Sequence, residues 1–315
     1  MISDKPVVLF VNHREKSCGV HQFGERLFFP ALKSEKFSCH YIDPAEGSEF
    51  DHWVGQLNPN IIVYNYYSAA TMPWLSSQKV LSQKNRFKQI GIFHELPLDN
   101  MNFDVIIHQD PSNTDTRFIN IARPIPDYRP ESFDSATPVF GSFGFGLGGK
   151  GFTRVVEYVL KEYDNAIIRF NIPFAAFGDP SGAGARDWAA KISSMVSGKR
   201  GIYTIITHEL MEERTLLDWL ASNTINCFLY DENYGRGISG TLDYALAAGK
   251  PIAITKSWQF KHFWEINEQC LIEKQSLHEI IAQGTQHLQV YHNIWGNKAV
   301  LHDFEAIFSN ILAKD

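Results

Sequence analysis

The sequence predicts an α/β protein built from two doubly wound parallel sheets, each covered by helices. Short apolar runs of strand length alternate with helical patterns along almost the whole chain, which is typical of parallel sheets with helical crossovers. The 315 residues suffice for two domains of about 150 residues each. The alternation breaks at the proline-rich stretch 123–130, where we place the domain boundary. The expected domains are therefore 1–130 and 131–298, and a last helix in 299–315 is expected to cross back to the first domain.

Each expected element follows from a run of apolar residues with period 2 or 3.6. In the first half we expect strands over 7–12, 38–43, 61–66, 90–94, 105–108 and 119–122, with helices over 23–32 and 73–87. In the second half we expect strands over 139–143, 166–172, 202–206, 226–230 and 251–255, with helices over 152–163, 185–196, 209–221, 241–248 and 299–312. Ligands of such open sheets bind at the carboxyl ends of the strands, so we expect a cleft between the two domains.

Composition excludes several classes of protein. No apolar run approaches the length of a membrane span, and no signal-like segment opens the chain. A formal charge of −6 argues against nucleic-acid binding. The four cysteines (Cys18, Cys39, Cys227 and Cys270) are scattered, so neither a disulfide framework nor a zinc site is expected. A cytoplasmic protein fits these features best.

The segment 231–255 reads as an acidic loop, a glycine-rich turn, a helix, a glycine stop and a strand. Ser239 is the expected N-cap of the helix, and Gly249 with Pro251 is expected to end it. Backbone N–H groups at such a turn, with the positive end of the helix dipole behind them, favour an anion. The expected anion ligands are Arg236, Gly237, Ser239, Gly240 and Thr241. The alternative is that any parallel αβ unit needs such caps.

A second glycine-rich turn, 141–151, lies between an expected strand and an expected helix. Its glycines allow a ligand to approach the backbone, and one lysine adds a positive charge. We expect Gly146, Gly148, Gly149 and Lys150 to hold a diphosphate together with the Ser239 turn. The alternative is a flexible loop with a solvated lysine. A dinucleotide fingerprint fits less well, because its glycine spacing is absent.

Several motifs together resemble one family. They are the Lys-Gly-helix junction at 144–152, the helix–strand–acidic series at 209–231, and Ala-Leu-Ala-Ala-Gly-Lys-Pro at 245–251. In the first half they are Cys-Gly-Val-His at 18–21, Phe-His-Glu at 93–95 and the linker 125–130. This pattern resembles the GT-B glycosyltransferases, particularly the family 4-like group (glycosyl transferases group 1). The resemblance implies two Rossmann-like domains facing a cleft.

The resemblance implies transfer of a sugar from a nucleotide-diphosphate sugar to a glycan or lipid-linked hydroxyl, with retention of configuration. Surface-polysaccharide assembly is the setting it suggests. No Asp-x-Asp motif occurs, so we expect no essential metal, and the nucleotide sugar is a co-substrate rather than a cofactor. We expect His94, Glu95, Glu232 and Asp243 to be catalytic, Asp231, Tyr234 and Tyr244 to contact the donor sugar or nucleoside, and His13, Arg14, Gly19 and His21 to lie on the acceptor side.

The chain departs from the family pattern at two places. Arg236 and Tyr244 stand where many relatives carry the Glu-x7-Glu pair, and Phe145 stands where many carry an arginine. Arg236 is expected to supply that missing charge. Two other functions stay open: a GT-B-fold nucleotide-sugar epimerase, and a non-catalytic nucleotide-sugar or glycan-binding module.

The basic amphipathic segment 74–88 suggests a peripheral contact with the inner face of a membrane. The alternative is a helix with a solvated charged face.

Overall fold

The computed structural model describes residues 5–66, 71–95, 101–131, 133, 135–234, 237–264 and 267–313. The chain divides into two compact units. The first combines 1–124 with 294–315, and the second comprises 125–293. The division lies six residues before the expected boundary at 130, and the second unit ends five residues before the expected 298. The last helix is therefore part of the first unit.

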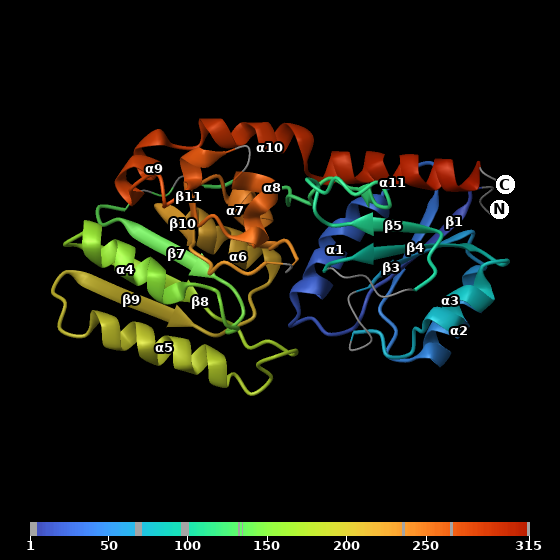
Figure 1. Ribbon diagram of the computed structural model, residues 1–315, viewed down its shortest axis with the longest axis horizontal. Coiled ribbons are helices and arrows are strands. Elements are labelled where there is room, and N and C mark those ends of the chain that lie inside the picture. Colours follow the sequence, from blue (N-terminus) through green and yellow to red (C-terminus); the bar gives the residue numbers. More distant parts are fainter. Residues whose placement is uncertain are drawn as a thin grey trace. The chain divides into compact units, whose positions relative to one another are not determined.

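The first unit holds a six-stranded parallel sheet in the order β2-β1-β3-β4-β5-β6 (Figure 1). Its strands are β1 (Val7–Val11), β2 (Ser38–Ile42), β3 (Ile61–Asn65), β4 (Lys88–Phe93), β5 (Val105–His108) and β6 (Ile119–Asn120). After β2 the chain crosses to the other side of β1 to form β3. The strand order therefore reverses between β1 and β3, and ligands of doubly wound sheets bind at such a switch point.

Helices cover both faces of this sheet. Those of the first unit are α1 (Gly19–Ala31), α2 (Gly47–Leu57), α3 (Ser77–Gln83) and α11 (Asn297–Leu312). On one face Leu9 and Tyr64 share a core with Phe50 of α2 and Val80 of α3. On the other, Phe10 lies 4.6 Å from Phe28 of α1 and 5.3 Å from Phe304 of α11, ring to ring. These aromatic contacts fix the last helix to the sheet that the chain left at Pro124.

The second unit holds a five-stranded parallel sheet in the order β11-β10-β7-β8-β9. Its strands are β7 (Val139–Phe143), β8 (Ala166–Asn171), β9 (Ile202–Thr207), β10 (Ile225–Phe228) and β11 (Ile252–Ile254). Here the chain runs outward through β8 and β9 and then returns to form β10 on the other side of β7. The switch point of this sheet therefore lies between β7 and β10.

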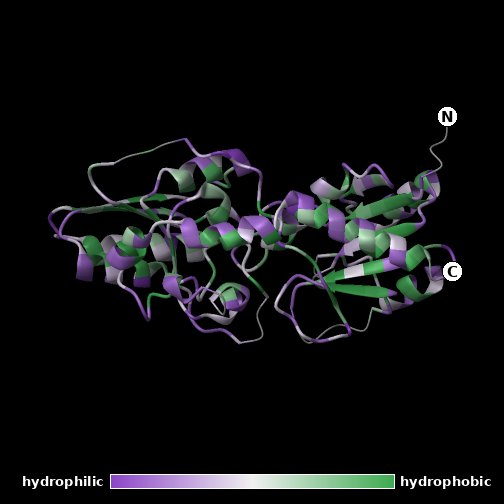
Figure 2. Cartoon of the chain, turned by 90° about the horizontal axis from the view of Figure 1, so that it is seen from above, coloured by the Kyte–Doolittle hydropathy of each residue, from purple (hydrophilic) through white to green (hydrophobic). Residues whose placement is uncertain are grey.

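The helices of the second unit are α4 (Phe152–Glu162), α5 (Ala183–Val196), α6 (Glu213–Ala221), α7 (Thr241–Ala248), α8 (Lys261–Trp264) and α9 (Leu277–Gln283), followed by α10 (Gln289–Ile294), which ends at the division. Residues of α4, α5 and α9 form one core with the sheet face that carries Phe140 and Ile168. Phe143 lies on the opposite face, with its ring 5.7 Å from that of Tyr244 in α7. In Figure 2 the strands are predominantly hydrophobic, whereas hydrophobic and hydrophilic residues alternate along the helices.

The α/β fold class with parallel sheets is confirmed, and most elements lie within a few residues of their expected bounds. Helix α2 was not expected, because only two of its residues, Phe50 and Val54, are buried and they form too short an apolar stripe to recognise. The helix expected over 209–221 begins at Glu213 instead. Three short 3₁₀ helices and helices α8 to α10 were also not expected.

The helix expected over 73–87 is wrong in extent. Only α3 is helical, with Ser76 as its N-cap accepting a bond from the Lys79 N–H at 3.1 Å. Trp74 stacks on Phe50 at 4.8 Å, and Val80 is buried in the core. Lys79 forms an ion pair with Asp51. The apolar residues of this segment thus serve the core of the unit. In the part of the chain that the structure describes, no helix combines the length and apolarity that crossing a membrane requires.

Candidate functional site

The switch point of the second unit brings the two glycine-rich turns together. β7 and β10 are parallel neighbours, with Phe140 opposite Ile225. Their carboxyl ends therefore lie at the same edge of the sheet, and each leads into one of the turns. The Gly149 carbonyl accepts a hydrogen bond from the Asp231 N–H at 2.9 Å. The two segments that the sequence singled out separately are thus bonded to each other.

The first turn is shaped by glycines that no other residue can replace without strain. Gly149 and Gly151 have φ of 78° and 63°. A Cβ at Gly151 would lie 1.8 Å from the Leu229 carbonyl oxygen, and one at Gly146 would lie 2.5 Å from the Ala185 nitrogen. Gly151 ends the turn as the N-cap of α4. The glycines therefore bring this loop against both β10 and α5.

The N–H groups of this turn fall into two sets. Those of Gly144 and Gly146 donate to the carbonyls of Asn171 and Pro173, so they hold the loop and do not face a ligand. The Gly146 amide is thereby removed from the expected phosphate ligands. Within the described ranges, the N–H groups of Gly148, Gly149 and Lys150 have no internal acceptor. These three amides lie at the start of α4, where the helix dipole favours an anion.

Lys150 is held in place. Its Nζ lies 3.3 Å from the Tyr230 hydroxyl oxygen and 4.3 Å from the centroid of that ring. Tyr230 is fully buried, and its carbonyl accepts a bond from the Thr255 hydroxyl at 2.6 Å. A half-buried ammonium over a rigid aromatic face is pre-positioned, because little side-chain entropy is left to lose on binding. This arrangement contradicts the alternative of a freely solvated lysine.

Arg154 belongs to the site, although the sequence analysis missed it. Its guanidinium donates to the carbonyls of Leu229 and Tyr230 and forms an ion pair with Asp231. The arginine thereby fixes the end of β10 against α4. A basic residue in the first turn of the helix, four positions after Lys150, was the signal that could have identified it.

The acidic loop is partly occupied by internal contacts. Asp231 pairs with Arg154, and a Glu232 carboxylate oxygen accepts from the Trp258 N–H at 3.2 Å. Tyr234 is 77% exposed, with its ring 5.7 Å from that of Trp258. Of the residues in this loop that are expected to contact the nucleotide sugar, Tyr234 is the most exposed.

Two further expected residues are buried. Asp243 is completely buried in α7, and Tyr244 is nearly so. Arg236 lies outside the described residues.

The second turn differs in detail from the expectation. Gly240, not Ser239, is the N-cap of α7, and no side chain caps this helix. The Ser239 N–H donates to the Gln259 carbonyl at 3.0 Å, and its hydroxyl lies 3.0 Å from that of Thr241. The Ser239 amide is therefore not available to an anion, and the Gly237 carbonyl accepts from Gln259 Nε2 at 3.4 Å. The Gly249 stop is confirmed, with φ of 65°.

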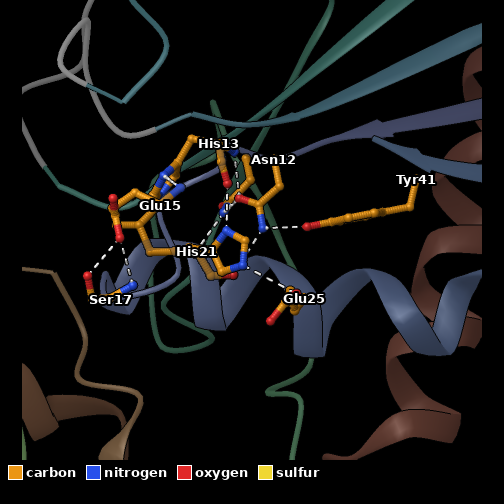
Figure 3. Close-up of polar contacts among 9 residues, drawn as sticks. Asn12, His13, Glu15, Ser17, His21, Glu25 and Tyr41 are labelled. Atoms are coloured by element: carbon orange, nitrogen blue, oxygen red, sulfur yellow. Dashed lines mark hydrogen bonds and ion pairs between the residues drawn. The ribbon is translucent and has the colours of Figure 1, made fainter. Parts of the chain in front are cut away.

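The first unit has its own polar cluster at the switch point between β1 and β3 (Figure 3). Asn12 directly follows β1 and Asn65 is the last residue of β3, and Asn65 Nδ2 donates to Asn12 Oδ1 at 2.8 Å. The His94 Nε2 lies 2.7 Å from Asn65 Oδ1. Asn12 also donates to the Tyr41 hydroxyl at 3.1 Å. Two asparagines that the sequence analysis missed thus position the expected His94, and their place directly after an apolar run was the available signal.

Burial sets the charge of the histidines in this cluster. Desolvation lowers the pKa of His94 to about 3 and that of His13 to about 4, so both rings are neutral at neutral pH. Desolvation also lowers the pKa of His21, but bonds to Glu25 and to the His13 carbonyl outweigh it, and the net pKa is raised. The His21 ring nitrogens lie 2.5 Å from that carbonyl and 3.2 Å from the Glu25 carboxylate (Figure 3).

The remaining expected residues of this unit lie near the cluster in sequence but have other surroundings. Arg14 makes a two-pronged ion pair with Glu49, through contacts of 3.0 and 2.9 Å. Gly19 is the exposed first residue of α1, and Glu95 is partly exposed directly after His94. Among the described residues, no group of three or more acidic, histidine or cysteine side chains is placed to hold a metal ion.

Solved structures of other proteins share this fold. No family model and no curated protein sequence matches the chain. Among solved structures, it is similar to a glycosyltransferase from Rickettsia africae ESF-5, with 12% identity and a TM-score of 0.66 over 99% of this chain and 100% of that one. It is also similar to sucrose-phosphate synthase from Thermosynechococcus elongatus, with 11% identity and a TM-score of 0.69 over 99% and 100% of the two chains. HepE of Anabaena, solved in complex with UDP, has 10% identity and a TM-score of 0.59 over 96% and 99%.

The fold is that of the GT-B glycosyltransferases. The expected resemblance is confirmed at the level of fold, since the similarity covers 99% of this chain and 100% of each of the first two structures. Identities of 10–12% establish a similarity of fold only, so the chemistry of the site depends on this chain's own residues.

Proposed function

We propose that this protein is a glycosyltransferase that takes its sugar from a nucleotide-diphosphate donor bound at the β7–β10 switch point. The observation that carries the proposal is the Lys150 ammonium fixed over Tyr230 beside three amides without internal acceptors, at the start of a helix. A pyrophosphate matches this group of donors in charge and in hydrogen bonding. UDP in the Anabaena structure supports a nucleotide ligand for this fold.

The chemistry follows from charge. When the sugar leaves, negative charge grows on the diphosphate, and the Lys150 ammonium and the amides of Gly148 and Gly149 would stabilise it. These donors are held before substrate arrives, so no reorganisation is needed at the moment of reaction. The same groups supply the compensation without a metal. Arg236 would add a second cation from the other turn.

The acceptor is proposed to bind at the switch point of the first unit, near His94. A neutral imidazole can hydrogen-bond a sugar hydroxyl, and burial keeps His94 neutral across the physiological range. Because a pKa of about 3 makes the ring a weak base, its proposed role is to orient the acceptor. Asn12 and Asn65 are positioning residues for this ring. A glycan or lipid-linked hydroxyl, transfer with retention and a role in surface polysaccharide remain proposals.

Lys150→Ala tests the donor site. We expect its affinity for UDP, GDP or ADP, whichever binds the wild type best, to fall about 10- to 100-fold, since a charge-assisted bond contributes about 1.5–3 kcal/mol. Affinity for the matching nucleoside should not change. Calorimetric titration measures both, and Lys150→Arg should recover part of the loss. Lys161→Ala, in the last turn of α4, is the matched control.

Equal losses for nucleotide and nucleoside in Lys150→Ala would refute a diphosphate site at this turn. Product analysis with the donor that binds separates the functions that stay open. Release of nucleoside diphosphate indicates a transferase, whereas a changed sugar still attached to the nucleotide indicates an epimerase. Binding without either product indicates a binding module, which the internal pairing of Asp231 and Glu232 would favour.

A further inference from the structure

Among the described strands, the edge strand β9 of the second unit pairs with β8 alone. The described strands at sheet edges are β2, β6, β9 and β11, and β9 is the longest of them, with six residues. Its sequence, Ile-Tyr-Thr-Ile-Ile-Thr, contains neither a charge nor a proline. Soluble proteins usually blunt such an edge with lysine, proline or a bulge, because its free N–H and C=O groups pair readily with another chain.

One face of β9 is also uncovered. Ile202 packs into the core shared with α5, whereas Tyr203 and Ile205 are 63% and 50% exposed. Side chains alternate along a strand, so both exposed residues lie on the sheet face opposite α5. The edge of the sheet beside α5 can be followed in Figure 1. This leaves an aromatic and a β-branched side chain on the solvent side of an open edge.

The backbone of β9 presents a defined set of outward groups. The carbonyls of Gly201 and Thr207 accept bonds from β8 and its flank, at 3.0 and 2.8 Å. Because bonding alternates along a parallel strand, the odd-numbered residues of β9 face β8. The N–H and C=O groups of Ile202, Thr204 and Ile206 therefore point away from the sheet.

This edge is complementary to itself. If two copies pair antiparallel about a two-fold axis at Thr204, Ile202 of one faces Ile206 of the other and all outward groups are bonded. The same register places Tyr203 against Ile205 of the second copy, which is a favourable aromatic–aliphatic pair. In the same register, the exposed Lys199 of each copy lies opposite the exposed Glu209 of the other copy. In the described part of the chain, neither Lys199 nor Glu209 has an ion-pair partner of its own.

We propose that two copies of this chain associate through antiparallel pairing of β9, forming one continuous ten-stranded sheet. The surface that associates consists of Ile202–Thr207 with Lys199 and Glu209 at its ends. Backbone bonds at Thr204 and the Tyr203–Ile205 contacts hold the pair, and the terminal charges set its register. This association is separate from the nucleotide site and does not depend on the proposed activity.

Sedimentation velocity of the full chain, from about 1 to about 100 µM, tests the pairing. We expect a monomer–dimer equilibrium in this range for the wild type. Thr204→Pro should make the protein monomeric, because proline removes an outward N–H while sparing the bonds to β8. Thr204→Val keeps the N–H and should still dimerise. Circular dichroism confirms that each variant is folded.

A charge exchange supplies a second test that does not alter the strand. Lys199→Glu alone and Glu209→Lys alone should each weaken the dimer about tenfold, because each creates two like-charge contacts. An equimolar mixture of the two variants should recover it, since a mixed pair has opposite charges at both ends. A wild type that stays monomeric at every concentration overturns the proposal, and so does a dimer that neither Thr204→Pro nor the charge variants weaken.

Discussion

Gly151 shows how one residue connects two parts of the nucleotide site. Its φ of 63° lets the chain turn from the loop into α4, and its missing side chain lets β10 approach. The contact is with the Leu229 carbonyl, which Arg154 also binds. A single glycine therefore sets the distance between the two loops that we propose hold the diphosphate.

Gly151→Ala should lower the free energy of unfolding by at least about 2 kcal/mol, because it combines a strained φ with a clash against backbone. Gly148→Ala is the matched control: a Cβ there meets nothing within 4 Å, and its φ is not in the left-handed region. We expect the control to change stability by less than about 1 kcal/mol. Urea unfolding of both variants measures the difference. Equal effects of the two substitutions would show that the approach to Leu229 is not tight.

At the scale of elements, the start of α5 supports the glycine loop. The Asp179 carboxylate accepts the N–H groups of Gly184 and Ala185, each at 3.0 Å, and so caps the helix from outside it. Gly146 lies directly against Ala185. The position of this helix end therefore determines where the loop can lie.

Asp179→Ala should destabilise the protein by about 1–2 kcal/mol, the usual effect of losing an N-terminal cap. Because Gly146 rests on the same turn, nucleotide affinity should fall as well. Asp187→Ala, on the exposed side of α5, removes only a surface pair with Lys191 and should cost less than about 0.5 kcal/mol. Thermal unfolding and nucleotide titration report the two effects. Unchanged nucleotide binding in a destabilised Asp179→Ala protein would separate the cap from the loop.

At the scale of the whole molecule, buried histidines make the stability of the first unit depend on pH. The first unit contains His13 and His94, whose pKa values fall to about 4 and about 3 on folding because of burial. The unfolded chain takes up protons on these residues below about pH 6.5, whereas the folded unit does not. His21 has the opposite sign: its raised pKa adds stability at low pH that is lost as the pH rises through it.

The stability of the first unit should therefore fall with acidity below about pH 6.5, by up to about 1.4 kcal/mol per pH unit for each of His13 and His94. Amide hydrogen exchange between pH 7 and about pH 5, corrected for intrinsic rates, measures this locally. We expect strands β1 and β3 to lose protection relative to β7 and β8. His13→Asn should reduce the slope. A second unit that loses protection first would contradict this assignment.

Much of the architecture could be predicted from the sequence because it depends on local periodicity. Parallel strands buried on both faces are short apolar runs, and eleven strands were expected close to where they lie. Helix α7 was expected with its observed bounds, since its apolar residues and Gly249 define it locally. Helix α2 was missed because two buried residues carry too little periodic signal.

The site itself depended on the tertiary structure. The sequence alone determined that two glycine-rich turns exist in this chain and that one of them carries Lys150, since composition and spacing are local properties. Only the strand order made β7 and β10 neighbours, seated Lys150 on Tyr230 and brought Arg154 to Asp231. These contacts join residues about 80 positions apart, and no local pattern records which distant partner a side chain will find. The same reason explains why Asn12 and Asn65 became part of the His94 cluster only once their strands were paired.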